Sequence, residues 1–257
     1  ETLAQETQAF AECVLDATNA WEWVIQDKAL LSGVPEVTQQ ALSHQATAKG
    51  LGSPQAPSWV ITLHAPCVGP VLRYAHQREV RQKVWEAYQS IGVLPPYDNT
   101  QRVRTILALR QEKAQLLGHS HFPDWVLARR MAQNGAKALG FIEDLHQAVE
   151  PAFQEAWGQL GTFAKTLSGQ NWGSEGLQPW DLAYIMEAYR QKMLHFDAEA
   201  LRPYFELNAV MQGLWKLAHQ LFGLRIEPVQ DAPPAWDDQV KLYTVADKQG
   251  RPVGYFY

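Results

Sequence analysis

The sequence has few of the features that mark specialised classes of protein. It holds only two cysteines, Cys13 and Cys67, which lie far apart and outside any CxxC or Cys/His cluster. Neither a disulfide framework nor a zinc knuckle is therefore expected, and the default location is a reducing cytoplasm. No apolar run approaches the roughly 20 residues that span a bilayer, and the start lacks the basic and hydrophobic regions of a signal peptide.

Charge of one sign is also scarce in any one place. The 22 basic and 27 acidic residues are interspersed and leave a net charge of −5, which argues against nucleic acid or an anionic membrane as a partner. The signatures GxSxG, the P-loop and the dinucleotide fingerprint are absent. Hydrophobic residues make up 46% of the 257 positions. That is enough to form the buried core of one large domain or two modest ones.

Most of the chain shows helical periodicity. The clearest apolar stripe steps by three and four and predicts one face of a long helix: Ile142, Leu145, Val149, Phe153, Ala156, Leu160, Phe163 and Leu167. Pro151 falls inside it and predicts a kink or two abutting helices. We expect this apolar face to pack against another part of the protein.

Shorter stripes predict three more helices. They lie at 103–117, entered near Asp98 or Asn99 and stopped at Gly118, and at 182–193 and 210–221. For the last of these, Asn208 is the expected N-cap and Gly223 the expected left-handed closing residue.

Strand signals are few. Aromatic and β-branched runs predict strands near 59–63, 224–226, 240–245 and 253–257, the last two joined by a hairpin over 246–250. The expected fold class is therefore mainly α, with a small β element near the C-terminal end.

Two histidine pairs are candidate metal ligands, and a structural interpretation is favoured for both. His119 and His121 follow Gly118, where a loop or a helix cap needs no metal. His146 and Glu150 stand four residues apart on a helix, which is typical of a solvated side-chain pair.

Cys67 near His64 and His76 is the one arrangement that resembles a nucleophile and its base. It begins an apolar stretch with Val68 and Val71, so a buried small hydrophobic residue is the favoured interpretation. A Cys67-dependent hydrolase stays open as a weaker alternative.

Four segments, in order, resemble the thimet oligopeptidase and oligopeptidase A family of zinc metallopeptidases, most closely the bacterial oligopeptidase A type. The family pattern usually carries Asn where this chain has Cys13. The segments are 14–18 with Trp21, 59–88, 99–131, and 177–223, which opens with Leu177-Gln178-Pro179-Trp180-Asp181. The resemblance covers nearly the whole chain.

The resemblance implies a helical shell around a deep channel in which zinc-bound water hydrolyses short peptides. The zinc would be held by His-Glu-x-x-His, in which two imidazoles four residues apart face one side of a helix. None of the eight histidines here is followed by Glu. We therefore expect residues 1–257 to be a single partial region of a larger cytoplasmic peptidase, inactive alone. It would bind no zinc. Its expected partner is the missing C-terminal catalytic half.

In that family, Gly254, Tyr255, Phe256 and Tyr257 match the start of a strand beside the substrate channel. The expected role of the chain is therefore wall and scaffold, including one edge strand that pairs with the backbone of a short peptide. The competing interpretation is a metal-free helical peptide-binding or scaffold module. If the chain folds alone, exposed apolar surface and self-association are expected.

Overall fold

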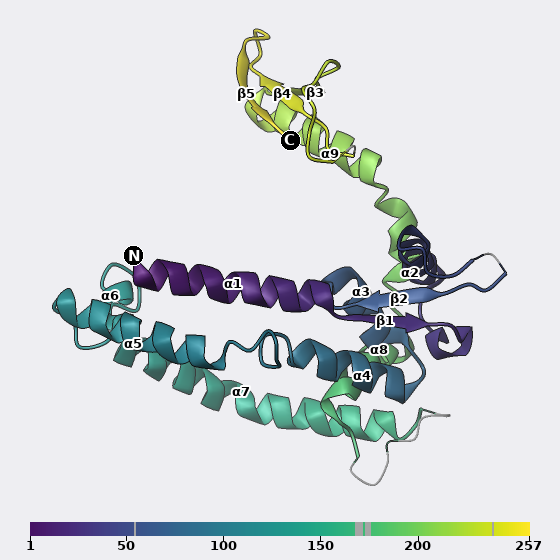
Figure 1. Cartoon of the computed structure of the whole chain (residues 1–257), viewed down its shortest axis with the longest axis horizontal. Coiled ribbons are helices and arrows are strands. Elements are labelled where there is room, and N and C mark those ends of the chain that lie inside the picture. Colours follow the sequence, from purple (N-terminus) through teal and green to yellow (C-terminus); the bar gives the residue numbers. More distant parts are fainter. Residues whose placement is uncertain (54, 168–171, 173–175, 238) are drawn as a thin grey trace. The chain divides into compact units, whose positions relative to one another are not determined.

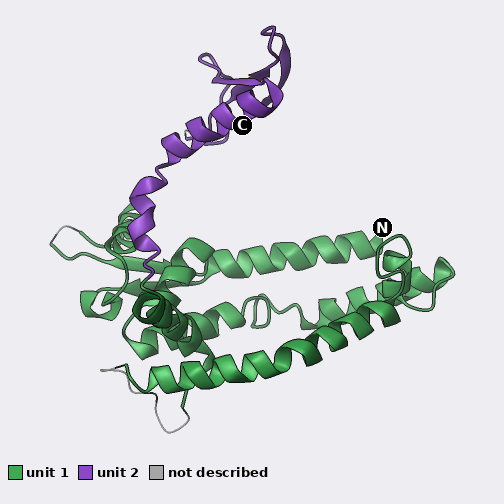
Figure 2. Cartoon of the chain, turned by 180° about the vertical axis from the view of Figure 1, so that it is seen from behind, with its two compact units in different colours: residues 1–195 green, residues 196–257 purple. Residues whose placement is uncertain are grey.

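The computed structural model describes residues 1–53, 55–167, 172, 176–237 and 239–257. As predicted, the described chain is mainly α-helical, with small antiparallel sheets. It divides into two compact units, residues 1–195 and 196–257, coloured separately in Figure 2. Within the described residues, no helix is both long enough and apolar enough to cross a bilayer.

The first unit contains most of the helices (Figure 1). Two strands, β1 (Glu22–Ile25) and β2 (Trp59–Thr62), pair antiparallel, with Ile25 opposite Trp59. A 3₁₀ turn, η1, covers Lys28–Leu31. The helices are α1 (Thr2–Ala20), α2 (Glu36–Ala48), α3 (Ala65–Tyr74), α4 (Arg78–Gln89), α5 (Thr100–Leu116), α6 (Phe122–Leu127), α7 (Gly135–Ala164) and α8 (Pro179–Leu194).

The main core lies where the β1–β2 pair meets α2, α3 and α4. β2 is buried along its whole length, and its aromatic and β-branched residues are the ones that favour a pleated, packed surface. Strand β1 was not predicted, although Trp23-Val24-Ile25 is a short run of the same kind. The buried residues of this core include Ile25, Leu31, Val34, Leu42, Trp59, Ile61, Leu63, Val68, Val71, Val80 and Val84.

Helix α7 contacts its neighbours mainly at its two ends. At the start, the Asn134 side chain accepts a bond from the Lys137 N–H, and the Gly135 N–H donates to Asp124 of α6 at 2.9 Å. At the other end, Phe163 packs edge-on against Tyr189 of α8. The helix is continuous through Pro151. Of the two alternatives predicted there, a kink or two abutting helices, the second is therefore wrong. The helix ends at Ala164, before Leu167.

The second unit places one helix against a three-stranded sheet. A 3₁₀ segment, η2 (Glu199–Tyr204), leads to α9 (Leu207–Phe222) and then to β3 (Arg225–Pro228), β4 (Tyr243–Ala246) and β5 (Pro252–Phe256). The strand order is β3-β4-β5, all antiparallel. β4 begins three residues after the position that the sequence indicated.

The sequence predicted the C-terminal end of α9 correctly but not its N-cap. Gly223 closes it with φ +72°, as expected. The prediction that Asn208 is the N-cap is wrong: the N-cap is Glu206, two residues earlier, and its carboxylate accepts a bond from the Ala209 N–H at 2.8 Å. Glutamate reaches these orphan N–H groups as aspartate does, and its charge suits the positive end of the helix dipole.

The turn that joins η1 to α2 requires glycine at position 33. Gly33 has φ +86°, and a Cβ there would collide with the Tyr74 carbonyl oxygen and the His76 ring. We expect Gly33→Ala to lower the free energy of unfolding by about 2 kcal/mol. As a control, Gly69→Ala in α3, where a Cβ meets nothing, should raise it by about 1 kcal/mol because alanine favours the helix. Urea unfolding measures both, and equal effects would contradict this account.

Candidate functional site

Strand β5, which carries the predicted channel residues, lies at the edge of its sheet. It pairs with β4 through Tyr243–Phe256, Thr244–Tyr255 and Val245–Gly254, and β4 is the central strand. In an antiparallel pair, alternate residues turn their N–H and C=O away from the partner. Within the described sheet, the outer edge of β5 therefore offers backbone donors and acceptors for another extended chain.

The two faces of β5 differ. Phe256 stacks on Tyr243 at 5.3 Å, and Trp215 of α9 packs against both rings, so this face is the one that attaches the sheet to the helix. Tyr255 points the other way and is 64% exposed. Tyr257, just beyond the strand, lies 5.4 Å from the exposed Trp236. Aromatic side chains thus flank the free edge on both sides.

Gly254 has no steric need to be glycine within the chain. A Cβ built there meets nothing within 4 Å, and its φ is not in the left-handed region. A glycine in a strand often marks a bulge or the close approach of another backbone, and the register shift between Val245 and Ala246 lies directly opposite. The chain therefore accommodates a Cβ at position 254.

The hairpin before β5 is built by its turn residues. Asp247 accepts bonds from the N–H groups of Gln249 and Arg251 and from the Arg251 guanidinium, and Gly250 adopts φ +80°. The bonds from Arg251 and Gln249 hold the pKa of Asp247 below its usual value. This turn sets the register that places Gly254 opposite Val245.

The histidine candidates lie in separate, local arrangements. His121 is the N-cap residue of α6, and His119 belongs to the loop before it. His146 and Glu150 form an exposed pair on α7, with Nδ1 and Oε2 3.9 Å apart. Among the described residues, no group of three or more His, Cys, Asp or Glu side chains could hold a metal ion.

Cys67 is a member of the main core. Its Sγ accepts a bond from the Thr62 N–H at 3.3 Å, and burial raises the pKa of the thiol. His64 is the exposed N-cap residue of α3, and His76 bonds Ser32 at 3.2 Å. A raised pKa disfavours the thiolate that a nucleophile needs, so the geometry supports the structural interpretation.

The most strongly bonded group in the first unit is a buried ion cluster that the sequence did not reveal. The fully buried Asp181 of α8 accepts bonds from Arg78 Nε and Nη2, the latter at 2.7 Å, and from Arg81 Nη2 at 3.0 Å. The Gln178 N–H also donates to it, closing a capping box. Burial raises the pKa of Asp181, but the bonds from Arg78, Gln178 and Arg81 outweigh it and hold that pKa below its usual value.

Arg81 extends the cluster to α3. Its Nη1 donates to the carbonyl oxygens of Ala75 at 2.7 Å and His76 at 3.1 Å, just beyond the C-terminal end of that helix, where positive charge is favoured. Its guanidinium lies 4.3 Å from the ring centroid of Tyr184. The cluster therefore joins α3, α4 and α8, bringing segments 100 residues apart into one site. It is a structural joint, because its charged groups bind one another.

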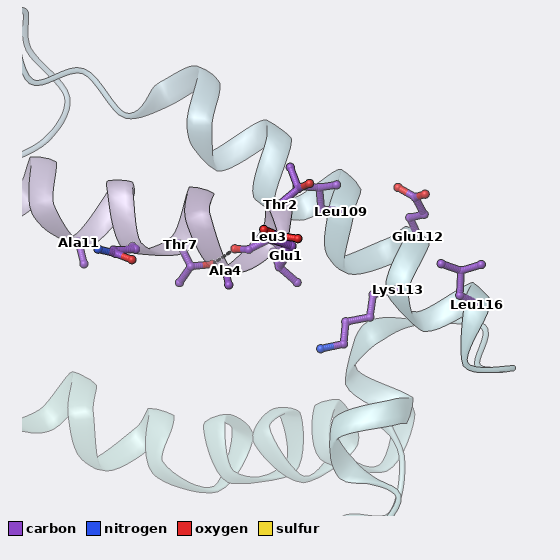
Figure 3. A pocket seen from close by; sticks show the side chains of 11 residues that line it. Glu1, Thr2, Leu3, Ala4, Thr7, Ala11, Leu109, Glu112, Lys113 and Leu116 are labelled. Carbon is purple, nitrogen blue, oxygen red and sulfur yellow. Dashed lines mark hydrogen bonds between the residues drawn. The ribbon is translucent and has the colours of Figure 1, made fainter.

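The groove in Figure 3 lies between the first half of α1 and the last half of α5. Its volume is about 840 Å³, and apolar groups such as Leu3, Leu109 and Leu116 form much of its wall. The Thr7 hydroxyl donates to the Leu3 carbonyl at 2.7 Å. Its polar lining includes Glu112 and Lys113 of α5 and Thr2 and Thr7 of α1.

Comparison with known proteins decides the family. The model of peptidase family M3 matches residues 71–257. The chain belongs to peptidase family M3. Organellar oligopeptidase A of Arabidopsis thaliana is 36% identical over 259 residues, covering 100% of this chain and 32% of that protein. Oligopeptidase A of Escherichia coli strain K12 is 32% identical over 260 residues, covering 99% of this chain and 37% of that protein.

The M3 chain spans about a third of the length of the curated relatives it matches. The resemblance to the oligopeptidase A family is thus confirmed. The family match includes the ion cluster of Arg78, Arg81 and Asp181 as well as strand β5. The run Leu177-Gln178-Pro179-Trp180-Asp181, which opens the fourth segment of that resemblance, contributes the buried carboxylate of Asp181.

Removing the charge of Asp181 should weaken the first unit strongly. Asp181→Asn leaves two arginines without their counter-ion, and we expect a loss of about 3–5 kcal/mol in the free energy of unfolding. Glu6→Gln, which removes a partly exposed pair with Arg102, should cost less than about 1 kcal/mol. Denaturant unfolding at neutral pH compares them, and similar losses would contradict the assigned role of the cluster.

The same carboxylate should shape the acid stability of the chain. Because the pKa of Asp181 is lowered by folding, its contribution is present above its unfolded pKa of about 3.9 and is lost as pH falls through the folded value. The gap in stability between the unaltered chain and Asp181→Asn should therefore narrow below about pH 4. Unfolding curves from pH 7 to pH 3 test this, and a constant gap would refute it.

The two thiols should react differently. Cys67 is buried with a raised pKa, whereas Cys13 is partly exposed. We expect iodoacetamide at neutral pH to modify Cys13 in the native chain and Cys67 only after unfolding, because only the accessible thiolate reacts. Peptide mass spectrometry gives the sites. Rapid native alkylation of Cys67 would revive the nucleophile hypothesis.

Proposed function

We propose that this chain is a structural part of a zinc-dependent oligopeptidase that hydrolyses short peptides inside a deep channel. Membership of peptidase family M3 supports a peptidase as the complete protein. The names of the relatives, among them oligopeptidase A and dipeptidyl carboxypeptidase of Escherichia coli, indicate short peptides as substrates. A cytoplasmic location is part of the proposal, and a probable cytosolic oligopeptidase A of Arabidopsis thaliana, 36% identical, supports it.

The described residues do not fit a zinc site. The histidines lie on separate elements, and no cluster of metal-binding side chains is formed among the residues that the structure describes. In the proposed complete enzyme, the zinc ligands and the catalytic glutamate would therefore come from polypeptide outside these 257 residues, the catalytic half, which is the proposed partner. This chain alone would be inactive.

The observation that carries the proposed role is the free edge of β5. Gly254, Tyr255 and Phe256 belong to a strand that has one partner in the described sheet and is bordered by aromatic rings. A peptide in extended conformation can add to such an edge through main-chain hydrogen bonds, with its side chains alternating between the two faces. In this proposal, β5 holds and orients the backbone of a short peptide as one wall of the channel.

The competing function is a metal-free peptide-binding or scaffold module, and the coding sequence after Tyr257 separates the two. If it continues in frame to a His-Glu-x-x-His, the chain is part of a zinc oligopeptidase. If a stop codon follows directly, the metal-free module becomes the better account.

Backbone pairing at β5 can be tested directly. We expect a short fluorescent peptide to bind the chain, and N-methylation of alternate amides of that peptide to weaken binding about tenfold, since each lost main-chain bond costs about 1 kcal/mol. Methylation at the intervening positions, whose amides point away from β5, is the matched control. Fluorescence anisotropy measures the affinities. Equal effects in the two registers would contradict strand addition.

A further inference from the structure

A pocket of the first unit lies around the end of the short helix α6, which contacts α5 and α7 (Figure 1). Its volume is about 610 Å³, within the range of roughly 300–1,000 Å³ that is typical of small-molecule sites. It combines two guanidinium groups and an imidazole with an indole and small apolar side chains. The lining residues are His119, Trp125, Val126, Ala128, Arg129 and Arg130.

The segment around this pocket is basic, although the charges of the chain as a whole are interspersed. Residues 102–137 hold seven lysine or arginine residues and two acidic ones, Glu112 and Asp124, while the whole chain has a net charge of −5. The Nζ atom of Lys113 lies 4.4 Å from the ring centroid of Trp125, so a further cation stands beside the indole of the pocket. Positive charge gathered in this way attracts an anion.

The loop that carries Arg129 and Arg130 is held by backbone hydrogen bonds. The Gln133 N–H donates to the Arg130 carbonyl oxygen at 3.0 Å, and Gln133 adopts φ +67°, a conformation that few non-glycine residues adopt. The Gly135 N–H donates to the Asp124 carboxylate at 2.9 Å, so the one acidic side chain of α6 is directed to the start of α7. A ligand would meet arginines on ordered backbone, which lowers the entropic cost of binding.

Neither arginine of the pocket is paired within the first unit as far as the structure describes it. The side chains of Arg129 and Arg130 form no hydrogen bond or ion pair there, whereas other arginines of the chain, Arg78, Arg81, Arg102 and Arg190, each pair with a carboxylate. Guanidinium groups bind carboxylates and phosphates through paired, charge-assisted N–H bonds. Two neighbouring guanidinium groups suit a dianion with several acceptor oxygens better than a single carboxylate, and a phosphate ester is such a group.

We propose that this pocket, which we call the Arg129–Arg130 pocket, binds a small phosphorylated molecule. The guanidinium groups of Arg129 and Arg130 hold the dianionic phosphate, and Trp125 and Val126 contact an apolar or planar part of the ligand. The volume of about 610 Å³ leaves room for more than a phosphate group. This inference goes beyond the proposed peptidase role and uses none of the residues of β5.

The test compares three small probes by isothermal titration calorimetry on the 257-residue chain. At pH 8 a phosphate monoester is a dianion, because its second pKa is about 6. Phenyl phosphate carries this dianion and a ring, benzenesulfonate has a similar shape with one negative charge, and inorganic phosphate lacks the ring. We expect phenyl phosphate to bind about tenfold more tightly than either of the others. Equal affinities in either comparison, or no binding of phenyl phosphate, would overturn the proposal.

Variants locate the binding to the two arginines. Arg129→Gln with Arg130→Gln should weaken phenyl phosphate about 30-fold or more. The matched control, Arg104→Gln with Arg225→Gln, removes the same charge from exposed arginines that do not line the pocket, and should change the affinity less than about twofold because salt screens exposed charges. All four side chains are exposed, so circular dichroism should show both variants folded. Equal weakening by the two pairs would reveal non-specific attraction and refute the site.

An acidic polypeptide is the rival occupant of the Arg129–Arg130 pocket. A short glutamate-rich peptide tests it, and we expect this peptide to bind more weakly than phenyl phosphate. Tighter binding of the peptide, lost with Arg129→Gln and Arg130→Gln, would make an acidic chain the partner and overturn the proposal. None of these results bears on the zinc-peptidase assignment, which the coding sequence after Tyr257 tests separately.

Discussion

The carboxylate of Asp181 lies between the guanidinium groups of Arg78 and Arg81, and the arrangement of the first unit depends on that contact. The apolar core around β1 and β2 includes α2, α3 and α4, while α8 packs with the end of α7 in a smaller apolar cluster. Hydrophobic burial is non-directional and does not by itself set how two such clusters are joined. Forked, charge-assisted bonds do, because they require one orientation of α8 against α4 and the end of α3.

Once α8 is placed, the direction of α7 follows. Phe163 and Tyr189 attach the last turns of α7 to α8, and apolar residues of the earlier turns, such as Leu145 and Phe153, stay exposed in the described chain. In the described sheet, the outer edge of β5 presents backbone N–H and C=O groups that pair with no other strand. An extended strand can add to such an edge, which is why we propose a wall and scaffold role for this part of an M3 peptidase.

Local sequence predicted much of the fold but less of its detail. Periodicity located α5, α7, α8 and α9, because a three-to-four step of apolar residues is a property of the helix itself. Glu206 rather than Asn208 caps α9, since either oxygen-bearing side chain can reach the free N–H groups and the backbone decides between them. The apolar stripe was predicted correctly as one face of a helix as far as Phe163, and its last residues pack against α8 as expected. Ile142, Leu145, Val149 and Phe153 stay exposed in the described chain.

By itself, the sequence determined the mainly helical class and the membership of the M3 family, because both depend on patterns along the chain. The run of aromatic and β-branched residues around Gly254 also predicted strand β5. Only the tertiary structure showed that Asp181 is buried between two arginines. That contact joins residues up to 103 positions apart, and no local spacing encodes which distant charges will meet.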